Sequence, residues 1–354
     1  MGNITETYQN IADILSFETQ PSYLEKKLKN SKFNWDYIVT EGSKHLILPA
    51  IYCRLKAKGL LKELPHELKD YLEILTDINR NRNVSITTQA LKISQLLKEH
   101  KINHVFLKGT ALLTANYYED SAERMIGDID ILIEKNHIHK ASKIIESSGY
   151  TSADTTIANT FIAHRHMPRL ISKDHICAIE LHDKLFNKFV NKNLVTENIL
   201  NQKNIESIIN TPSKAHLFLH NMLNHQINNN GHLHKTFSFR SLYDSVLLLE
   251  KHDFKHLTEE IQKKPLIGYI YSLNYFFKPL EILDNQSKNI LFNYFIRYPL
   301  LHKNYIKLVR IISISSIMVN RGSLFLSNSN YRIAILNDRK RIINNLKTML
   351  LFKK

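Results

Sequence analysis

Hydrophobic residues repeat with helical spacing along most of this chain, and only a stretch near its centre departs from that pattern. From residue 4 to about residue 100, aliphatic and aromatic residues recur three to four positions apart, with lysine and glutamate between them. This spacing is typical of amphipathic helices. Gly59 and Pro65 indicate that one helix ends and another begins, because glycine favours helix ends and proline favours helix starts. We therefore expect residues 1–95 to form a helical N-terminal region.

The pattern changes at residue 102, where short apolar runs alternate with helical segments. INHVFLKG and GDIDILI predict strands, with the helical TALLTANYY between them. HIHKASKIIESSGY then predicts a helix that stops at Gly149, and HMPRLISK and CAIELHDKLF predict two further strands. Strands and helices in this order predict a small mixed β-sheet within a core that covers residues 96–190.

Helical spacing returns near residue 195, so residues 191–354 are expected to form a helical C-terminal region and the fold class to be α+β. The segment IKLVRIISISSIMV is apolar, but its short length and its two basic residues, Lys307 and Arg310, predict no transmembrane segment. Residues 331–354 predict a basic amphipathic helix that docks on the body with its basic face in water. Peripheral contact of this last helix with a membrane is the alternative.

Composition predicts a folded protein of the cytoplasm. Hydrophobic residues make up 43% of the chain, and the low counts of 9 glycines and 8 prolines disfavour long disordered linkers. Cys53 and Cys177 form no CxxC motif, so a reduced compartment is expected and a disulfide scaffold is not. The first residues contain acids and lack a basic segment before an apolar run, so we expect no signal peptide.

Charge is the strongest compositional signal. The chain has 48 lysines and arginines against 33 aspartates and glutamates, which gives a formal net charge of +15. This excess favours anionic partners such as nucleoside triphosphates, nucleic acid or an acidic membrane surface. Because the basic residues are spread along the chain, a solvated basic surface is the alternative.

Two aspartates in the central stretch are the first candidates for chemistry. In a strand over GDIDILI, Asp128 and Asp130 lie on the same face, because side chains two positions apart share a face. Carboxylates held this close repel each other unless a cation lies between them. Glu180, which follows Ile179 in a later predicted strand, can provide a third carboxylate. The three acids predict a Mg²⁺ site, and a solvent-facing edge strand is the alternative for the aspartate pair.

Residues just after the first predicted strand are candidate phosphate contacts. Gly109 would let the backbone approach a triphosphate at the start of a predicted helix, whose first amide groups favour anions. Lys108 would add positive charge, and the hydroxyl group of Thr110 could bind phosphate. An ordinary turn at Gly109 is the alternative.

Arg124 and His182 complete the candidate contacts. Arg124 could bind phosphate, or it could pair with Glu123 or Asp120 instead. His182 shares the predicted strand face of Glu180 and could touch a substrate, or it could be a hydrogen-bonded structural histidine.

Five histidines between residues 216 and 234 raise the question of a second metal site. His216 and His220 lie one helical turn apart, but no cysteine or acid lies in register to complete a zinc site. Hydrogen bonding at and between helices is the better interpretation, with Arg240 and Asp244, four positions apart, as an expected ion pair.

Three motifs together resemble the nucleotidyltransferase superfamily, and most of all the bacterial group described only as uncharacterised nucleotidyltransferases. They are LKGTALL at 107–113, RMIGDIDILI at 124–133 and AIELHDKL at 178–185. Members share a glycine after a strand, an acid-x-acid on the next strand and one further acid on a later strand. The resemblance is specific over about residues 95–190. Thr110 departs from it, because many members have a second small residue such as serine or glycine there.

The resemblance implies an enzyme that uses Mg²⁺ to move a nucleoside monophosphate from an NTP, such as ATP, to an acceptor hydroxyl group. The catalytic and metal-binding residues that it implies are Asp128, Asp130 and Glu180. The nucleotide contacts that it implies are Lys108, Gly109, Thr110, Arg124 and His182. The acceptor could be a small molecule, the end of an RNA or tRNA, or a protein side chain. A catalytically inactive nucleotide- or nucleic-acid-binding protein that retains the fold is the alternative, although three convergent carboxylates would repel phosphate without a metal.

Overall fold

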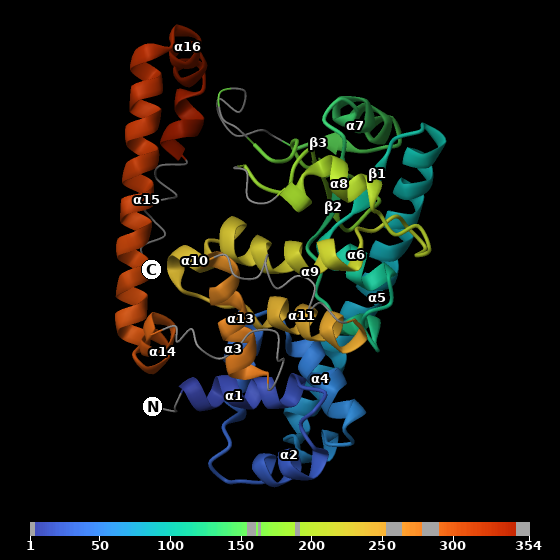
Figure 1. The fold of residues 1–354 in the computed structure, drawn as a ribbon, viewed down its shortest axis with the longest axis vertical. Coiled ribbons are helices and arrows are strands. Elements are labelled where there is room, and N and C mark those ends of the chain that lie inside the picture. The colour runs from blue at the N-terminus through green and yellow to red at the C-terminus, as the bar shows by residue number, and fades with distance from the viewer. Residues whose placement is uncertain are drawn as a thin grey trace.

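A computed structural model describes residues 4–153, 161, 164–187, 192–252, 264–277 and 290–344, and the fold is α+β as expected. A small sheet lies toward one end of the molecule and the first four helices lie toward the other (Figure 1). Helices α9 (Lys214–Leu223) and α11 (Phe239–Lys251) lie between them. This portion of the C-terminal region therefore packs between the sheet and the N-terminal helices, whereas α15 (Pro299–Ser327) runs along one side.

The N-terminal region is helical, and its helix boundaries follow the glycine and proline positions. Its helices are α1 (Ile4–Leu15), α2 (Pro21–Leu28), α3 (Trp35–Lys44), α4 (Leu48–Ala57) and α5 (His66–Glu99). Gly59 follows α4 with a φ angle of 69°, a conformation that glycine adopts without strain. Pro65 immediately precedes α5. The predicted break between these two helices is confirmed.

The sheet has five strands, and it is mixed as predicted. The strands are β1 (His104–Phe106), β2 (Asp128–Ile133), β3 (Thr151–Ser152), β4 (Leu170–Ile171) and β5 (Ala178–His182). Their order across the sheet is β1-β2-β5-β4-β3. Strands β2 and β5 are parallel, and the other pairs are antiparallel. The two central strands are therefore the ones that carry the candidate acids.

The alternation of β2 separates an apolar face from an acidic one. Ile129, Ile131 and Ile133 have no exposed surface, and they form one face of the strand. In the register of the parallel pair, Asp130 lies opposite Glu180. Because residues opposite each other share a face of the sheet, the two acids point the same way.

Helix α5 fixes the start of both central strands through buried polar side chains. The Asn79 and Asn83 amides both donate to the carbonyl oxygen of Arg124, at 3.2 and 2.8 Å. Gln89 donates to the carbonyl oxygen of Cys177 at 2.8 Å. These bonds satisfy backbone groups at the entry to β2 and β5, so the polar residues inside α5 position the strands that carry the acids.

The remaining α-helices of the described chain follow the N-terminal region. Within the core region they are α6 (Lys108–Thr114) and α7 (Ile138–Ser147), which is followed by Gly149 at a φ angle of 97°. Beyond the sheet they are α8 (Thr196–Asn201), α9, α10 (Gly231–His234), α11, α13 (Lys264–Phe276), α14 (Ile290–Arg297), α15 (Pro299–Ser327) and α16 (Ser329–Asn337). A π-helical turn, Asn224–Asn228, follows α9.

Helix α15 corrects the expectation that its segment is too short to span a membrane. The helix runs from Pro299 to Ser327, well beyond the apolar run of the sequence motif, and extends about 43 Å at 1.5 Å per residue. By length and composition alone it could cross a bilayer, and none of its residues is buried. Of the predicted helix over 331–354, the first part belongs to α16, and residues 345–354 lie outside the described residues.

Candidate active site

The three candidate acids lie side by side on the central strands, and one arginine connects two of them. Arg169, just before β4, donates from Nε to Glu180 Oε1 at 2.6 Å. Its Nη2 donates to Asp128 Oδ2 at 3.1 Å. A single guanidinium group therefore lies between a carboxylate of β2 and a carboxylate of β5.

Asp130 is the most enclosed of the acids, and its neighbours are basic. It is 2% exposed, and it pairs with the ammonium group of Lys108. His182 Nε2 lies 2.8 Å from Asp130 Oδ1 and 3.5 Å from Glu180 Oε2. The imidazole ring is thus held between the two carboxylates, as a hydrogen-bonded histidine at the base of the site.

The two aspartates of β2 differ in their electrostatic surroundings. Burial raises the pKa of Asp128, and the nearby negative charges of Asp130 and Glu180 raise it further. Burial would also raise the pKa of Asp130, but Lys108 and His182 together hold that pKa below its ordinary value. The charged form is therefore disfavoured at Asp128 and favoured at Asp130.

Glu180 and His182 stabilise each other's charged forms. Burial opposes the shift at Glu180, but the hydrogen bonds from His182 and Arg169 lower its pKa to about 2. Burial likewise opposes charge on His182, whereas its hydrogen bonds with Asp130 and Glu180 raise its pKa above the ordinary value. The charged forms of Asp130 and Glu180 are thus favoured, and Lys108, Arg169 and His182 balance them.

The donor atoms of the site fit a divalent cation. Asp130, Glu180 and His182 each offer one ligand atom, and these atoms lie within 4.8 Å of one another. Asp128 adds a carboxylate on the same strand face, 30% exposed at its side chain. Carboxylate oxygens suit Mg²⁺, and an imidazole nitrogen suits transition metals. Lys108, Arg169 and His182 already bind these carboxylates, so the site attracts positive charge.

The three expected phosphate contacts at the start of α6 have different surroundings. Lys108 lies beside Asp130, and its φ angle of 52° places its backbone in the left-handed region. A Cβ atom on Gly109 would lie 3.1 Å from Cγ1 of Ile126, so the glycine lets the helix pack against this side chain. Thr110 is 1% exposed, and among the described residues its hydroxyl oxygen has no hydrogen-bond partner. Contacts of all three residues with a nucleotide stay predictions.

Arg124 pairs with neither of the acids that the sequence offered as alternatives. Its guanidinium group bonds Asp244 of α11, with Nε at 3.1 Å and Nη2 at 3.0 Å from Oδ2. Glu123 instead accepts a hydrogen bond from Tyr243, and Asp120 pairs with Arg80. The fold thus connects the segment before β2 to a helix far along the chain.

The expected ion pair between Arg240 and Asp244 is also corrected, because Asp244 is bound by other groups. Among the described residues, its carboxylate pairs with Arg124 and accepts a hydrogen bond from the Tyr118 hydroxyl at 2.7 Å. Repulsion from the neighbouring Arg124, together with burial, lowers the pKa of Arg240 to about 10. Arg124 and Arg240 therefore place two positive charges close together.

A cleft of about 150 Å³ opens beside the two aspartates. Asp128 and Asp130 line it, together with basic and amide side chains from the helices opposite. The lining residues that sequence reasoning missed include Arg165, His220, Asn221, Asn224, Arg240 and Asp244. Ligand pockets usually measure about 300–1,000 Å³, so this cleft suits a phosphate chain rather than a whole nucleotide.

Two of the five histidines between 216 and 234, His216 and His225, form the hydrogen bonds that were expected. The His216 ring lies 2.9 Å from Ser213 Oγ, and His225 Nε2 donates to the carbonyl oxygen of Thr236 at 3.1 Å. Burial lowers the pKa of His220 to about 3. Within the described ranges, the group with metal-ligand geometry is that of Asp130, Glu180 and His182.

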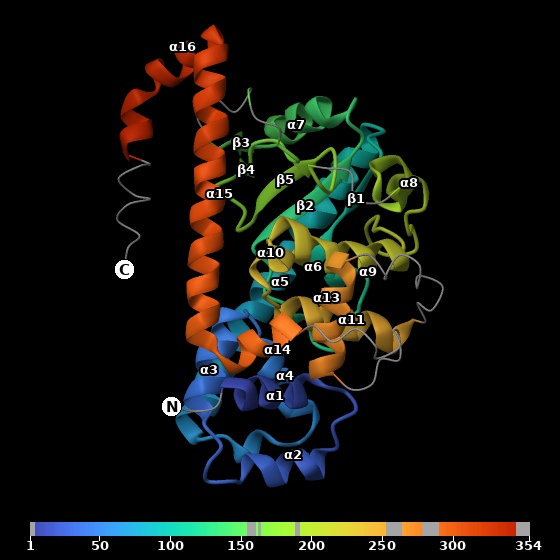
Figure 2. The same cartoon turned by 60° about the vertical axis from the view of Figure 1, so that its left-hand side comes forward.

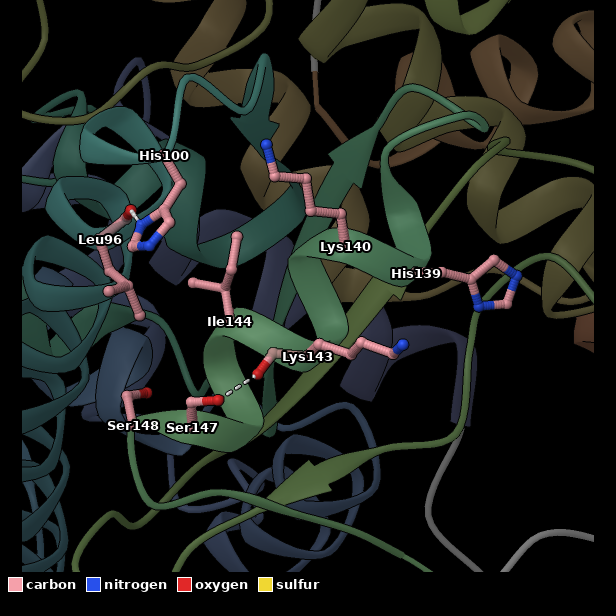
Figure 3. Close-up of a pocket in the computed structure, with 8 residues that line it drawn as sticks. All are labelled: Leu96, His100, His139, Lys140, Lys143, Ile144, Ser147 and Ser148. Carbon is pink, nitrogen blue, oxygen red and sulfur yellow. Dashed lines mark hydrogen bonds between the residues drawn. The ribbon is translucent and has the colours of Figure 1, made fainter.

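A larger cavity lies away from the acids, between the C-terminal end of α5 and helix α7 (Figure 3). It measures about 550 Å³, and no acidic residue lines it. Its polar groups bond the local backbone: His100 donates to the Leu96 carbonyl oxygen and Ser147 to that of Lys143, both at 2.9 Å. The candidate chemistry therefore belongs to the smaller cleft.

Comparison with known protein families identifies the family of the chain. Residues 31–266 match the family described as uncharacterised nucleotidyltransferase. This match spans more than half of the chain, so the protein belongs to that family, and the suspected resemblance is confirmed. The match extends on both sides of residues 95–190, into the helices that form the opposite wall of the cleft. The search of curated proteins found no match.

Proposed function

We propose that the protein transfers a nucleoside monophosphate from an NTP to an acceptor hydroxyl group at the cleft beside Asp128 and Asp130. The observation that carries this proposal is the grouping of three carboxylates on two parallel strands, with the two on β2 lining a cleft that has basic walls. In the reaction, the acceptor oxygen would attack the α-phosphorus, and the bond to the β-phosphate would break. Pyrophosphate would leave, and the acceptor would lose its hydroxyl proton.

The acids suit binding of Mg²⁺, which would neutralise phosphate charge and polarise the reacting phosphoryl group when bound. Asp128 and Asp130 reach the cleft and would be its main ligands. Glu180 does not line the cleft, and it is held by Arg169 and His182. These contacts favour a role for Glu180 in completing the metal site. To remove the proton of the acceptor instead, Glu180 would first have to lose its contact with Arg169.

Basic groups around the cleft suit the triphosphate. Lys108, Arg124, Arg165 and Arg240 all line it. Arg124 is held by Asp244 of α11, and together with Arg240 it would counter the charge of a leaving pyrophosphate. The base of the nucleotide would then extend out of the cleft, because its volume holds little more than phosphates.

The acceptor is proposed only by class. The net charge of +15 favours an anionic acceptor, and RNA or tRNA is the class to test first, ahead of small molecules and protein side chains. RNA binding of this kind should weaken steeply as salt rises, because it releases counterions.

A second candidate is a nucleotide-binding protein without activity. It is favoured by one observation: Lys108, Arg169 and His182 already neutralise the acids, so the carboxylates are balanced without a metal. A metal-binding measurement distinguishes the two candidates. In the enzyme, a cation must replace these basic groups at the carboxylates, whereas the inactive protein needs no such replacement.

The proposal is tested by incubating the protein with each of the four NTPs, labelled at the α-phosphorus, with Mg²⁺ and a cell lysate. Label in a lysate fraction would identify both the nucleotide and the acceptor class. Asp128→Asn serves as the control, because it removes a proposed ligand at a half-exposed position. Equal labelling by the wild type and this variant would reject the site, and absence of labelling with every NTP would favour the binding protein.

A further inference from the structure

Helix α15 exposes more large apolar side chains than any other described element. Those on its surface are Leu300, Leu301, Leu308, Ile311, Ile312, Ile314, Ile317, Met318, Val319 and Leu326. None of the residues of this helix is buried. Single exposed apolar residues are ordinary, but a continuous apolar surface of this kind marks an interaction site.

Most of the large apolar side chains of α15 lie on its exposed side, unlike those of a helix that packs on a protein core. Over the first half of the helix, the partly buried side chains that mark the side facing the body are His302, Tyr305, Ile306, Val309 and Ser313. The helical repeat continues this side through Ser316, Asn320 and Ser323. These three polar residues are themselves exposed, and the partly buried residues near the end of the helix are Leu324 and Phe325. Large exposed apolar side chains nevertheless extend from Leu300 to Leu326.

Both ends of α15 are attached to the body, so its outer face forms a lateral surface. At one end, His302 Nε2 donates to the His234 carbonyl oxygen at 2.8 Å, and Tyr305 donates to that of Leu233 at 2.9 Å. At the other end, Tyr331 of α16 packs edge-on against Phe161, with ring centroids 5.4 Å apart. Figure 2 shows the helix running along one side of the molecule.

The charge around this helix is of one sign. Residues 290–337 contain no aspartate or glutamate. Their basic residues are Arg297, Lys303, Lys307, Arg310, Arg321 and Arg332. Tyr294 and Tyr298, just before the helix, are also exposed. Apolar side chains flanked by basic and aromatic residues are typical of surfaces that meet anionic lipid headgroups.

The same charges disfavour a second copy of the chain as the occupant. Two α15 helices packed together would bring Lys307, Arg310 and Arg321 near like charges, with no acid on either helix to neutralise them. A membrane with anionic lipids satisfies both features at once, because it offers negative headgroups above an apolar interior.

We propose that α15 docks on the surface of a membrane that contains anionic lipids. The helix lies parallel to the membrane, with its apolar side chains among the acyl chains and its lysines and arginines at the level of the phosphates. This surface differs from the basic helix at 331–354 that the sequence offered for membrane contact. It holds the protein at a membrane whatever reaction the cleft performs.

Co-sedimentation of the full chain with lipid vesicles tests the proposal. Vesicles of phosphatidylcholine with phosphatidylglycerol are compared with vesicles of phosphatidylcholine alone, at low and high salt. The variant Leu308→Glu with Ile312→Glu places two charges on the outer face, at side chains that are 57% and 60% exposed. The matched control is Ile74→Glu with Ile78→Glu on α5, four residues apart like the first pair and 61% and 60% exposed.

We expect the wild type and the α5 variant to bind the anionic vesicles at low salt. The α15 variant should bind at least about tenfold more weakly, because binding scales with the apolar area that enters the membrane. No binding of the wild type, equal binding to both kinds of vesicle, or equal loss in the α5 control would overturn the proposal. Light scattering could instead show a wild-type dimer that the substitutions in α15 dissociate and those in α5 do not. Together with no vesicle binding by the wild type, that result would assign this face to a second copy of the chain.

Discussion

Asp130 and Glu180 lie opposite each other in the parallel register of β2 and β5, and the ring of His182 lies within reach of both carboxylates. Parallel strands need a connection between them, so acids distant in sequence come together only through the order of the sheet. In this protein that order places β5 directly beside β2. The consequences of this arrangement can be measured at individual residues.

The two aspartates of β2 should respond differently to neutralisation. Asp128→Asn and Asp130→Asn should both abolish transfer, because each removes a proposed ligand. Asp128→Asn should keep or slightly raise the melting temperature, since burial and the neighbouring acids raise the pKa of Asp128. Asp130→Asn should destabilise the protein by about 1–3 kcal/mol, because it weakens the bonds of a buried carboxylate to Lys108 and His182. Thermal unfolding without metal compares the variants, and equal loss of stability in both would contradict this account.

Lys108→Ala should weaken nucleotide binding and also cost stability. The side chain is 25% exposed and pairs with the buried Asp130, so its removal leaves that carboxylate with less positive charge. Nucleotide titration and thermal unfolding measure the two effects, and Lys140→Ala on the exposed side of α7 is the control for loss of one charge. Unchanged nucleotide affinity would leave Lys108 with a purely structural role.

Two glycines of the site offer a matched pair of variants. Gly109→Ala should destabilise the protein by about 1–3 kcal/mol, because its Cβ would lie 3.1 Å from Ile126, a side chain that is 6% exposed. Gly127→Ala should change stability by less than about 0.5 kcal/mol, because in the described part of the chain no atom beyond the two neighbouring residues lies within 4 Å of the position of its Cβ. Denaturant unfolding compares them, and a larger loss for Gly127→Ala would reject the packing at α6.

The sequence predicted those features that depend on local pattern. The alternation of GDIDILI indicated which residues of β2 share a face, and Gly59 and Pro65 marked the break before α5. Arg169 was missed because its contact with Glu180 requires β4 to pair with β5, which places Leu170 opposite Ile179. No local pattern specifies that pairing.

Two other misses have similar physical causes. The partner of Arg124 is Asp244, which packing of α11 against the core brings into reach, so neighbours in sequence were the wrong candidates. The length of α15 was underestimated because a basic residue within an apolar run does not end a helix when it lies on the surface. Long-range packing explains the partner of Arg124, and surface exposure explains the length of α15.

Stability should fall in mild acid because buried histidines must take up protons on unfolding. Burial lowers the pKa of His104, which has no exposed surface, to about 4. The unfolded chain therefore binds this proton below about pH 6.5 and the folded protein only below about pH 4, so the stabilisation is lost as the pH falls between those values. His104→Asn should reduce the slope of unfolding free energy between pH 5 and 6 by up to about 1.4 kcal/mol per pH unit.

Denaturant titrations at pH 5 and pH 6 measure that slope. His139→Asn, at an exposed position of α7, is the control and should leave it unchanged. An identical slope for His104→Asn and the wild type would show that His104 takes up its proton equally in both states.

The most direct test of the central claim asks which phosphorus atom is transferred. The protein is incubated with Mg²⁺, an acceptor fraction and the same NTP labelled in parallel reactions at the α-phosphorus or at the γ-phosphorus. Attack at the α-phosphorus predicts that only the α label enters the acceptor, that the γ label leaves as pyrophosphate, and that Asp130→Asn abolishes both events. Entry of the γ label into the acceptor would contradict nucleotidyl transfer and assign a kinase-type reaction to this cleft instead.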